Sequence, residues 1–275
     1  MTAPMQNETR QLPFPLSTLE SLGASFLRLV SEFGAVFLFT LDGIAALFTS
    51  PKQLRKIFYQ VYVIGARSFF LIALISAFTG MVLGLQLYYV LIKFGSEGML
   101  GAVVALALIL ELGPVLTAIM VVGRAGSAMA AEIGVMRISD QLDALTVMDI
   151  SPMGYLVSPR IMAAVISFPL LTALFDVIGI LGGYLTGVVM LGINEGIYFH
   201  RIESSVVWAD VSGGFIKSLV FGLIVAAASC YQGYFAHLRR DGVGPVAVSN
   251  ATTDAVVNSC ILILIADYAL TSFLL

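Results

Sequence analysis

Long apolar stretches separated by short polar breaks dominate the chain. A helix needs about 20 apolar residues to cross a bilayer, and five stretches reach that length. They cover residues 61–92, 99–134, 156–191, 215–235 and 255–275, with polar breaks at 93–98, 137–160, 194–210 and 237–250. The pattern therefore predicts an all-α integral membrane protein with five transmembrane helices.

The first 57 residues follow a different pattern. Apolar residues recur at helical spacing, and Glu20, Arg28 and Glu32 stand away from that stripe. The stripe consists of Leu16, Leu19, Leu22, Phe26, Leu29 and Phe33. Residues 33–48 are apolar but short, and they carry Asp42. We expect residues 1–57 to hold a tail and an amphipathic helix in the inner interface rather than a sixth span, and residues 58–275 to form the membrane domain.

Composition limits the classes of function that this chain can have. Only 11% of the residues are charged and 59% are apolar, and the mean hydropathy is +0.98. So few charges do not cover a soluble globule, which excludes soluble enzymes and nucleic-acid binding. The sequence has no P-loop, because Ile216-Lys217-Ser218 lacks the glycine that precedes the lysine in that motif. His200 and His237 have no partners at metal spacing. We expect no catalytic residue, metal or cofactor in this chain.

Lysine and arginine positions predict the orientation. A cytoplasmic N-terminus puts eleven of these residues inside: Arg10, Arg28, Lys52, Arg55, Lys56, Arg67, Arg124, Arg137, Arg160, Arg239 and Arg240. Only Lys93, Arg201 and Lys217 then lie outside. The bias favours this orientation, with the C-terminus outside.

The break between the second and third spans contains a short amphipathic pattern over residues 137–149. Ile138, Leu142 and Leu145 fall at i, i+4 and i+7, while Arg137, Asp140, Gln141 and Asp143 occupy other faces. Ser151-Pro152 is expected to end this helix, and Ser158-Pro159 to open the next one. The helix could lie on lipid, or it could dock into a cytoplasmic partner with the apolar stripe as its anchor. The pattern alone does not separate these two interpretations.

Several motifs, in order along the chain, resemble the MlaE family, the permease subunits of maintenance-of-lipid-asymmetry ABC transporters. They are Gly80-Met-Val-Leu-Gly-Leu-Gln86, Glu111-Leu-Gly-Pro114, Gly123-Arg-Ala-Gly-Ser-Ala128, Ala131-Glu-Ile-Gly134, Asp140-Gln-Leu142 and Ser158-Pro-Arg160. The resemblance runs from about Tyr59 to the C-terminus.

The resemblance implies a homodimeric permease in the bacterial inner membrane. It also implies two cytoplasmic ABC ATPase subunits that bind ATP and Mg²⁺, a periplasmic hexamer of MCE-domain subunits, a STAS-domain accessory subunit and a phospholipid substrate. It makes the helix at 137–149 the coupling helix seated in the ATPase.

Carboxylates inside the predicted spans are candidate functional groups, because a charge in hydrocarbon costs several kcal/mol. Glu111 lies near the midplane by residue count and stands in the family's Glu-Leu-Gly-Pro motif. It either braces helices or forms the polar floor of a lipid cavity, and the resemblance favours the cavity. We expect Asp176 and Asp267 to be structural and Asp254 to cap the last helix. Pro114 should kink the second span beside Glu111.

One face of the first span forms an apolar stripe of Leu83, Leu87, Val90, Leu91 and Phe94. Most such stripes pack on lipid or on other helices. In the family, the corresponding helix lines a cavity between the two protomers where acyl chains lie, so these residues are candidate lipid contacts. Small-residue stripes such as Gly80-x3-Gly84 and Gly179-x3-Gly183-x3-Gly187 predict close helix packing.

Three hypotheses follow. The first is an ABC permease that moves glycerophospholipid between the inner membrane and a periplasmic MCE carrier and so maintains outer-membrane lipid asymmetry. The second is a proton-coupled secondary transporter with Glu111, Asp176 and Asp267 as its relay. Against it stand the absence of an internal repeat and of an intramembrane base to pair with these carboxylates. The third is an assembly platform without transport.

Overall fold

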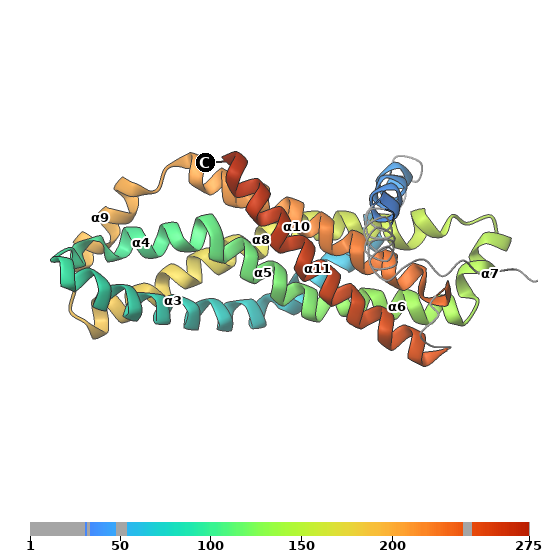
Figure 1. Ribbon diagram of the computed structural model, residues 1–275, viewed down its shortest axis with the longest axis horizontal. Helices are drawn as coiled ribbons and strands as arrows, with labels where there is room; N and C mark the ends of the chain where they lie inside the picture. The colour runs from blue at the N-terminus through green and yellow to red at the C-terminus, as the bar shows by residue number, and fades with distance from the viewer. Residues whose placement is uncertain (1–30, 32–33, 48–53, 239–243, 275) are drawn as a thin grey trace, which may run out of the picture.

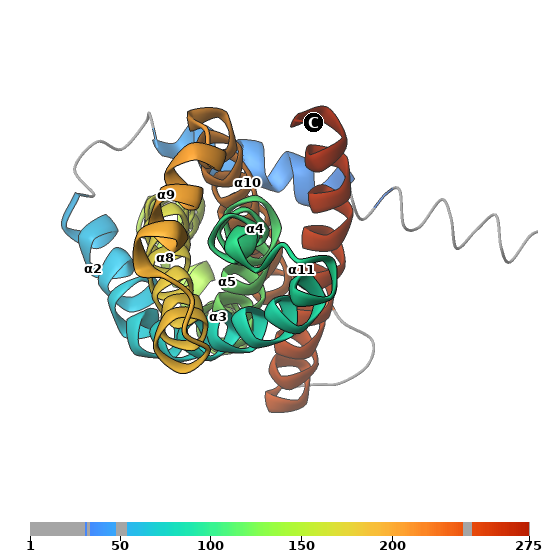
Figure 2. The same ribbon diagram turned by 90° about the vertical axis from the view of Figure 1, so that its left-hand side faces the viewer.

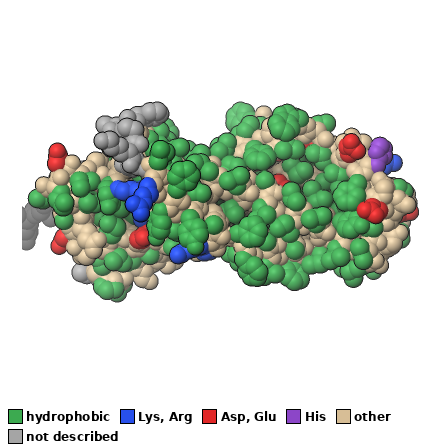
Figure 3. Space-filling view, turned by 180° about the vertical axis from the view of Figure 1, so that it is seen from behind, with side chains coloured by type: hydrophobic (Ala, Val, Ile, Leu, Met, Phe, Trp, Pro, Cys, Tyr) green, Lys and Arg blue, Asp and Glu red, His purple; other side chains and the backbone are tan. Residues whose placement is uncertain are grey.

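A computed structural model describes residue 31 and residues 34–47, 54–238 and 244–274. The described chain is an elongated helical bundle, with α7 at one end and α9 at the other (Figure 1). None of the described residues forms a β-strand. Hydrophobic side chains cover most of the length of the molecule, and charged side chains gather toward its two ends (Figure 3). This distribution suits a bundle whose middle lies in lipid.

Five helical segments are long and apolar enough to span a membrane, which confirms the predicted number. They are Leu54–Phe94, Glu97–Ile138, Met153–Met190, Trp208–Tyr234 and Pro245–Leu274. We refer to them as the first to fifth spans. Each begins or ends several residues away from its apolar stretch, because helix continues through polar residues that a hydropathy pattern assigns to loops.

The first three spans are interrupted helices. The first holds α2 (Leu54–Ile64) and α3 (Phe69–Leu91), and the third holds α8 (Ser158–Tyr184) between π-helical turns. Pro159 lies in the first turn of α8, as predicted. The second span holds α4 (Leu100–Ala107), α5 (Gly113–Val121) and α6 (Ser127–Ile138).

Two π-helical turns separate these three helices of the second span. They are η5 (Leu108–Leu112) and η6 (Val122–Gly126). The expected kink at Pro114 is therefore accompanied by a π turn immediately before it. The fourth span is α10 (Trp208–Tyr234) and the fifth is α11 (Pro245–Leu274).

Glycines allow the first and third spans to pack closely. A Cβ atom on Gly80 would overlap the backbone of Gly179, and one on Gly84 would lie 3.2 Å from the Cα of Gly183. In lipid, where apolar surface gains little by leaving the solvent, such close contact is a main source of helix association. The small-residue stripes predicted from the sequence therefore form the crossing of α3 and α8.

A helix that is too short to count among the spans precedes the first span. Gly34–Leu47 is shorter than a span, and it runs across the long axis of the bundle rather than along it (Figures 1 and 2). Phe39 anchors it, with its ring centroid 5.6 Å from those of Tyr231 and Tyr234 and 6.0 Å from that of Phe235. The predicted amphipathic stripe from Leu16 to Phe33 lies outside the described residues.

Two expectations about helix ends were wrong. The break at 194–210 contains a helix, α9 (Glu195–Ser205), because the Asn194 side chain accepts a hydrogen bond from the Ile197 N–H and caps its first turn. Buried Tyr198 attaches α9 to the bundle by donating to the carbonyl of Ile180 at 3.0 Å. Asp254 does not cap the last helix, since α11 begins at Pro245.

The α3–α8 crossing yields a prediction. Replacing Gly80 by Ala should destabilise the protein by about 1–3 kcal/mol, because the new methyl group overpacks a backbone contact. The matched control is Gly123→Ala, where an added Cβ meets no atom within 4 Å. Thermal unfolding in detergent should show a lower midpoint for the first variant alone. Equal midpoints would mean that this crossing is not close-packed.

Candidate functional site

A cluster of charged side chains joins three spans inside the membrane. Lys217 of α10 is almost fully buried, and its Nζ lies 2.9 Å from Glu111 Oε1 of the second span and 3.3 Å from Asp267 Oδ1 of the fifth. Thr271 Oγ1 accepts from Lys217 at 2.6 Å and donates to Glu111 at 3.1 Å. An ammonium group removed from water costs several kcal/mol unless it is paired, so these contacts hold the three spans together.

The backbone at Pro114 supplies a further partner for Lys217. Proline has no N–H, so the carbonyl of Leu110 loses the hydrogen bond that a helix would give it. Lys217 Nζ donates to that carbonyl at 2.8 Å. Leu110 and Glu111 both lie in the π turn η5, a type of turn that is frequent at functional sites. The Glu-Leu-Gly-Pro motif therefore provides both a carboxylate and a free carbonyl to one ammonium group.

Lys217 corrects two predictions. It does not lie outside the membrane, and the intramembrane carboxylates do not lack a basic partner. Charge counting put it on the outer side because it is the third residue of the apolar stretch 215–235, whereas α10 begins at Trp208, about two and a half turns earlier. Lys217 is a basic partner for Glu111 and Asp267, so a missing base does not speak against a proton relay.

A small cavity of about 140 Å³ lies beside the cluster. It is lined by Leu110 and Glu111, by four residues of α10 and by two of α11: Ala209, Asp210, Gly213, Lys217, Thr271 and Leu274. The Glu111 side chain remains 42% exposed, in contrast to the 4% of Lys217. Glu111 is thus the member of the cluster that a molecule outside the bundle reaches most easily.

Asp176 is not part of this cluster. It belongs to α8, and its Oδ1 is buried without a hydrogen-bond partner among the described residues. A Cβ on Gly113 would overlap that oxygen, so Gly113 is the residue that lets α8 approach the second span here. Of the three carboxylates in the relay hypothesis, the structure brings together only Glu111 and Asp267.

The apolar stripe predicted on the first span is divided between buried and exposed positions. Leu83, Leu87 and Leu91 pack partly against the core, whereas Val90 and Phe94 are exposed. None of the five lines the cavity beside Glu111. Within one chain the apolar stripe and the Glu111 carboxylate therefore do not form a common site. Lipid contact by the five residues of the stripe stays a prediction.

The predicted coupling helix is shorter than residues 137–149. α6 ends at Ile138, and α7 covers Gln141–Val147 after a turn in which Asp140 has φ 56°. Leu142 is 1% exposed, so it anchors α7 to the bundle and does not serve as the docking anchor that we expected. Ile138 and Leu145 are half-buried. The most exposed apolar side chains here are Val147 and Met148, at 88% and 68%.

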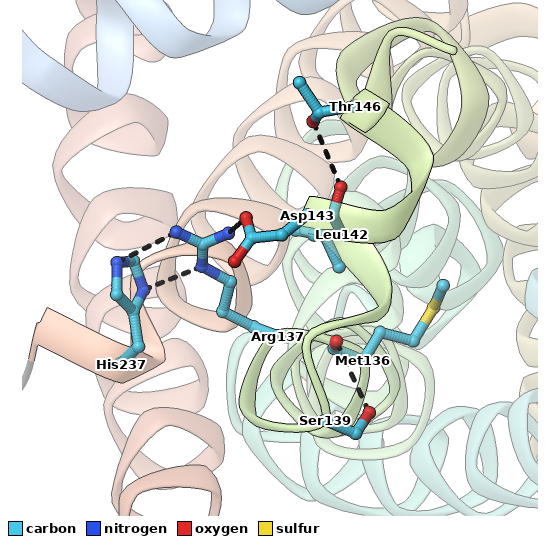
Figure 4. A network of polar contacts seen from close by, with 7 residues as sticks. All are labelled: Met136, Arg137, Ser139, Leu142, Asp143, Thr146 and His237. Carbon is cyan, nitrogen blue, oxygen red and sulfur yellow. Dashed lines mark hydrogen bonds and ion pairs between the residues drawn. The ribbon is translucent and has the colours of Figure 1, made fainter. Parts of the chain in front are cut away.

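Arg137 connects α7 to the rest of the bundle (Figure 4). Its Nη1 donates to Asp143 Oδ1 at 2.6 Å, and its Nε donates to His237 Nδ1 at 2.9 Å. His237 follows α10, and the neighbouring Tyr234 ring lies 5.8 Å from the guanidinium. Sequence reasoning found Arg137 and Asp143 but missed His237, because contacts a hundred residues apart leave no local signal.

Loss of water contact and the nearby Arg137 charge both lower the pKa of His237 from its ordinary value of 6.5. The hydrogen bond from Arg137 requires a neutral imidazole nitrogen. Because the pKa is lower in the folded state, protonation opposes this contact. The contact therefore stabilises the protein above about pH 6.5 and is lost as the pH falls through the lowered pKa.

Two other arginines have structural partners. Arg160 is buried, and its Nη2 lies 2.5 Å from Glu132 Oε2, so it ties the third span to the second. Arg124 donates to the carbonyl of Val63 and to Ser68 Oγ. It thereby satisfies a carbonyl in the last turn of α2.

Comparison with known proteins gives a match to the part of the chain that contains the five spans. The sequence profile of the family described as Permease MlaE matches residues 57–273. The chain is 42% identical to the intermembrane phospholipid transport system permease protein MlaE of Haemophilus influenzae, over 81% of this chain and 85% of the relative. It is 40% identical to a probable ABC transporter permease of Rickettsia felis, over 93% and 97% of the two chains. A probable ABC transporter permease of Synechocystis is 37% identical, over 91% and 92%.

The charge cluster yields a second prediction. Lys217→Met should destabilise the protein by about 1–3 kcal/mol, because Glu111 and Asp267 lose their buried partner. Adding Glu111→Gln and Asp267→Asn should recover part of this loss, since no unpaired charge then remains. Unfolding midpoints in detergent measure both effects. A triple variant less stable than Lys217→Met alone would contradict the pairing.

Proposed function

The chain belongs to the MlaE permease family, and on that premise we propose that it moves glycerophospholipid between the inner membrane and a periplasmic carrier. It is the multi-pass inner-membrane permease of an ABC transporter, and ATP hydrolysis takes place on separate subunits. The observation that carries the substrate class is the 42% identity to a permease named for intermembrane phospholipid transport. Such transport would help maintain the lipid asymmetry of the outer membrane.

Further parts of the complex follow from the family resemblance. We propose a homodimer of this chain, two cytoplasmic ATPases that bind ATP and Mg²⁺, a periplasmic MCE-domain hexamer and a STAS-domain accessory subunit. The exposed carboxylate of Glu111 supports a surface shared with a second copy, because a half-exposed charge at membrane depth needs further polar cover.

The orientation is also a proposal. With Lys217 inside the membrane, only Lys93 and Arg201 remain on the side assigned to the periplasm. Arg67 and Arg124 lie inside the first and second spans by the same count, so nine lysines and arginines remain on the other side, and the bias still favours a cytoplasmic N-terminus and a periplasmic C-terminus.

Docking to the ATPase is assigned to α7. Its Val147 and the adjacent Met148 present exposed apolar surface, and Asp140 and Gln141 are exposed beside them. A buried apolar centre with a polar rim is the usual composition of a protein interface. Leu142 and Asp143 would hold α7 in place rather than contact the ATPase.

The proton-coupled alternative has no support among the named relatives, although the cluster contains the basic group that such a relay would need. Reconstitution tests the choice. In proteoliposomes with its ATPase and MCE subunits, the chain should move labelled phospholipid only when ATP is present. Transport by the chain alone under a proton gradient would refute the proposal, and an assembly platform would move no lipid under either condition.

The docking surface yields a third prediction. Val147→Asp combined with Met148→Asp should reduce copurification of the ATPase about tenfold or more, because two apolar contacts are replaced by charges at an interface. The fold should persist, since both side chains are exposed. The control is Ile197→Asp on α9 at the opposite end of the bundle, where Ile197 is also exposed. Normal copurification with the double variant would place the docking site elsewhere.

A further inference from the structure

Polar contacts join the second and fourth spans at two levels. Inside the membrane, Glu111 pairs with Lys217. At the end of the bundle that carries α7, Arg137 donates to His237. Glu111 and Arg137 lie on one span, about 39 Å apart at 1.5 Å per residue, and Lys217 and His237 lie on or directly after the other. The two contacts therefore tie the same pair of helices at separate depths.

The surfaces between the two contacts are closely packed. A Cβ on Gly233 would lie 2.6 Å from the carbonyl oxygen of Ala130. Gly126 similarly faces Ser229, with 3.0 Å between an added Cβ and Oγ. Close packing of this kind between the second and fourth spans leaves little free space in which one helix could shift without the other. A shift imposed at one end is passed along the two spans as a small sliding movement of packed helices.

The second span contains the places where such a shift is accommodated. The π turn η5 includes Glu111, and the π turn η6 lies between Glu111 and Arg137. A π turn holds one extra residue, and its hydrogen bonds rearrange more easily than those of a regular α-helix. The fourth span, by contrast, is one uninterrupted α-helix from Trp208 to Tyr234. The fourth span would thus move as a rigid helix, whereas the second span would change its conformation at its π turns.

Arg137 stands where α7 meets this pair of helices. It holds Asp143 of α7 with Nη1, and its Nε and Nη2 both contact the His237 ring (Figure 4). Asp143 and Arg137 keep their own contact without His237, and buried Leu142 fixes α7 independently. His237 is therefore needed for the link to α10 and not for the attachment of α7.

We propose that the Arg137–His237 contact transmits displacement of α7 to α10 and so controls the pairing of Lys217 with Glu111. His237 is then a positioning residue, which acts on the transported lipid only through the membrane cluster. The inference rests on the proposed function, because it assumes that an ATPase moves α7. It assigns a role to a histidine that lies outside both the cluster and the docking surface.

The test compares His237→Ala with the unaltered chain in the complete complex, reconstituted in proteoliposomes. The ATPase should still copurify, and ATP should still be hydrolysed. The amount of labelled phospholipid moved per ATP should fall about tenfold, as expected for the loss of a hydrogen bond to a charged group. His237→Gln should restore much of the ratio, because its amide oxygen accepts from Arg137. The control is His200→Ala on α9, the other histidine of the chain.

The pH profile separates positioning from mere stability. Arg137 and Asp143 are the charged groups that act on His237. With His237 present, the lipid moved per ATP should decline as the pH falls through the lowered pKa of His237, and with His237→Gln this decline should disappear. A decline that persists in His237→Gln would overturn the proposal.

A double-mutant cycle tests the route. If His237 acts through the cluster, the effect of His237→Ala on the transport ratio should be much smaller when Lys217→Met is already present. Additive effects would overturn the proposal. An unchanged ratio in His237→Ala alone would also overturn it. If the unaltered complex moves no phospholipid with ATP, the proposed function fails instead, and the two failures are distinguishable.

Discussion

The arrangement of this bundle depends on one ammonium group that has no access to bulk water. Lys217 is stable at its depth only while carboxylates and neutral acceptors surround it, and these come from the second and fifth spans. Glycines give close contact but are tolerant of small slips along a helix. The lysine contacts are directional, so they fix the register of three spans that packing alone would leave less defined.

Length and hydropathy were sufficient to predict five spans, because a single apolar segment of this length satisfies its own backbone in hydrocarbon only as a helix. The preference of proline for the first turn of a helix also placed Pro159 correctly in α8. Length and hydropathy failed at Lys217, since a hydropathy pattern gives neither the depth at which a helix starts nor the direction of a side chain. α9 was missed for a related reason. Its polar sequence is typical of a loop, and the helix is secured by the Asn194 cap together with the tertiary contact of Tyr198.

The site was predicted in part. Glu111 was identified from its cost in hydrocarbon and from its motif, and the place of the coupling helix from its amphipathic pattern. Helical spacing could not reveal that the helix breaks at Ser139 and Asp140, nor that Leu142 turns inward. Whether an apolar residue faces its own bundle or a partner depends on the neighbouring elements, and a periodic stripe is the same in both cases.

The proline of the Glu-Leu-Gly-Pro motif has a consequence for the charge cluster. Because Pro114 has no N–H, it cannot give the Leu110 carbonyl the hydrogen bond of an α-helix. Lys217 bonds to that carbonyl, so its ammonium group is held by a neutral backbone oxygen as well as by carboxylates. Any other residue at position 114 would bring an N–H that competes with Lys217 for this oxygen, and the ammonium group would then lose one of its neutral acceptors.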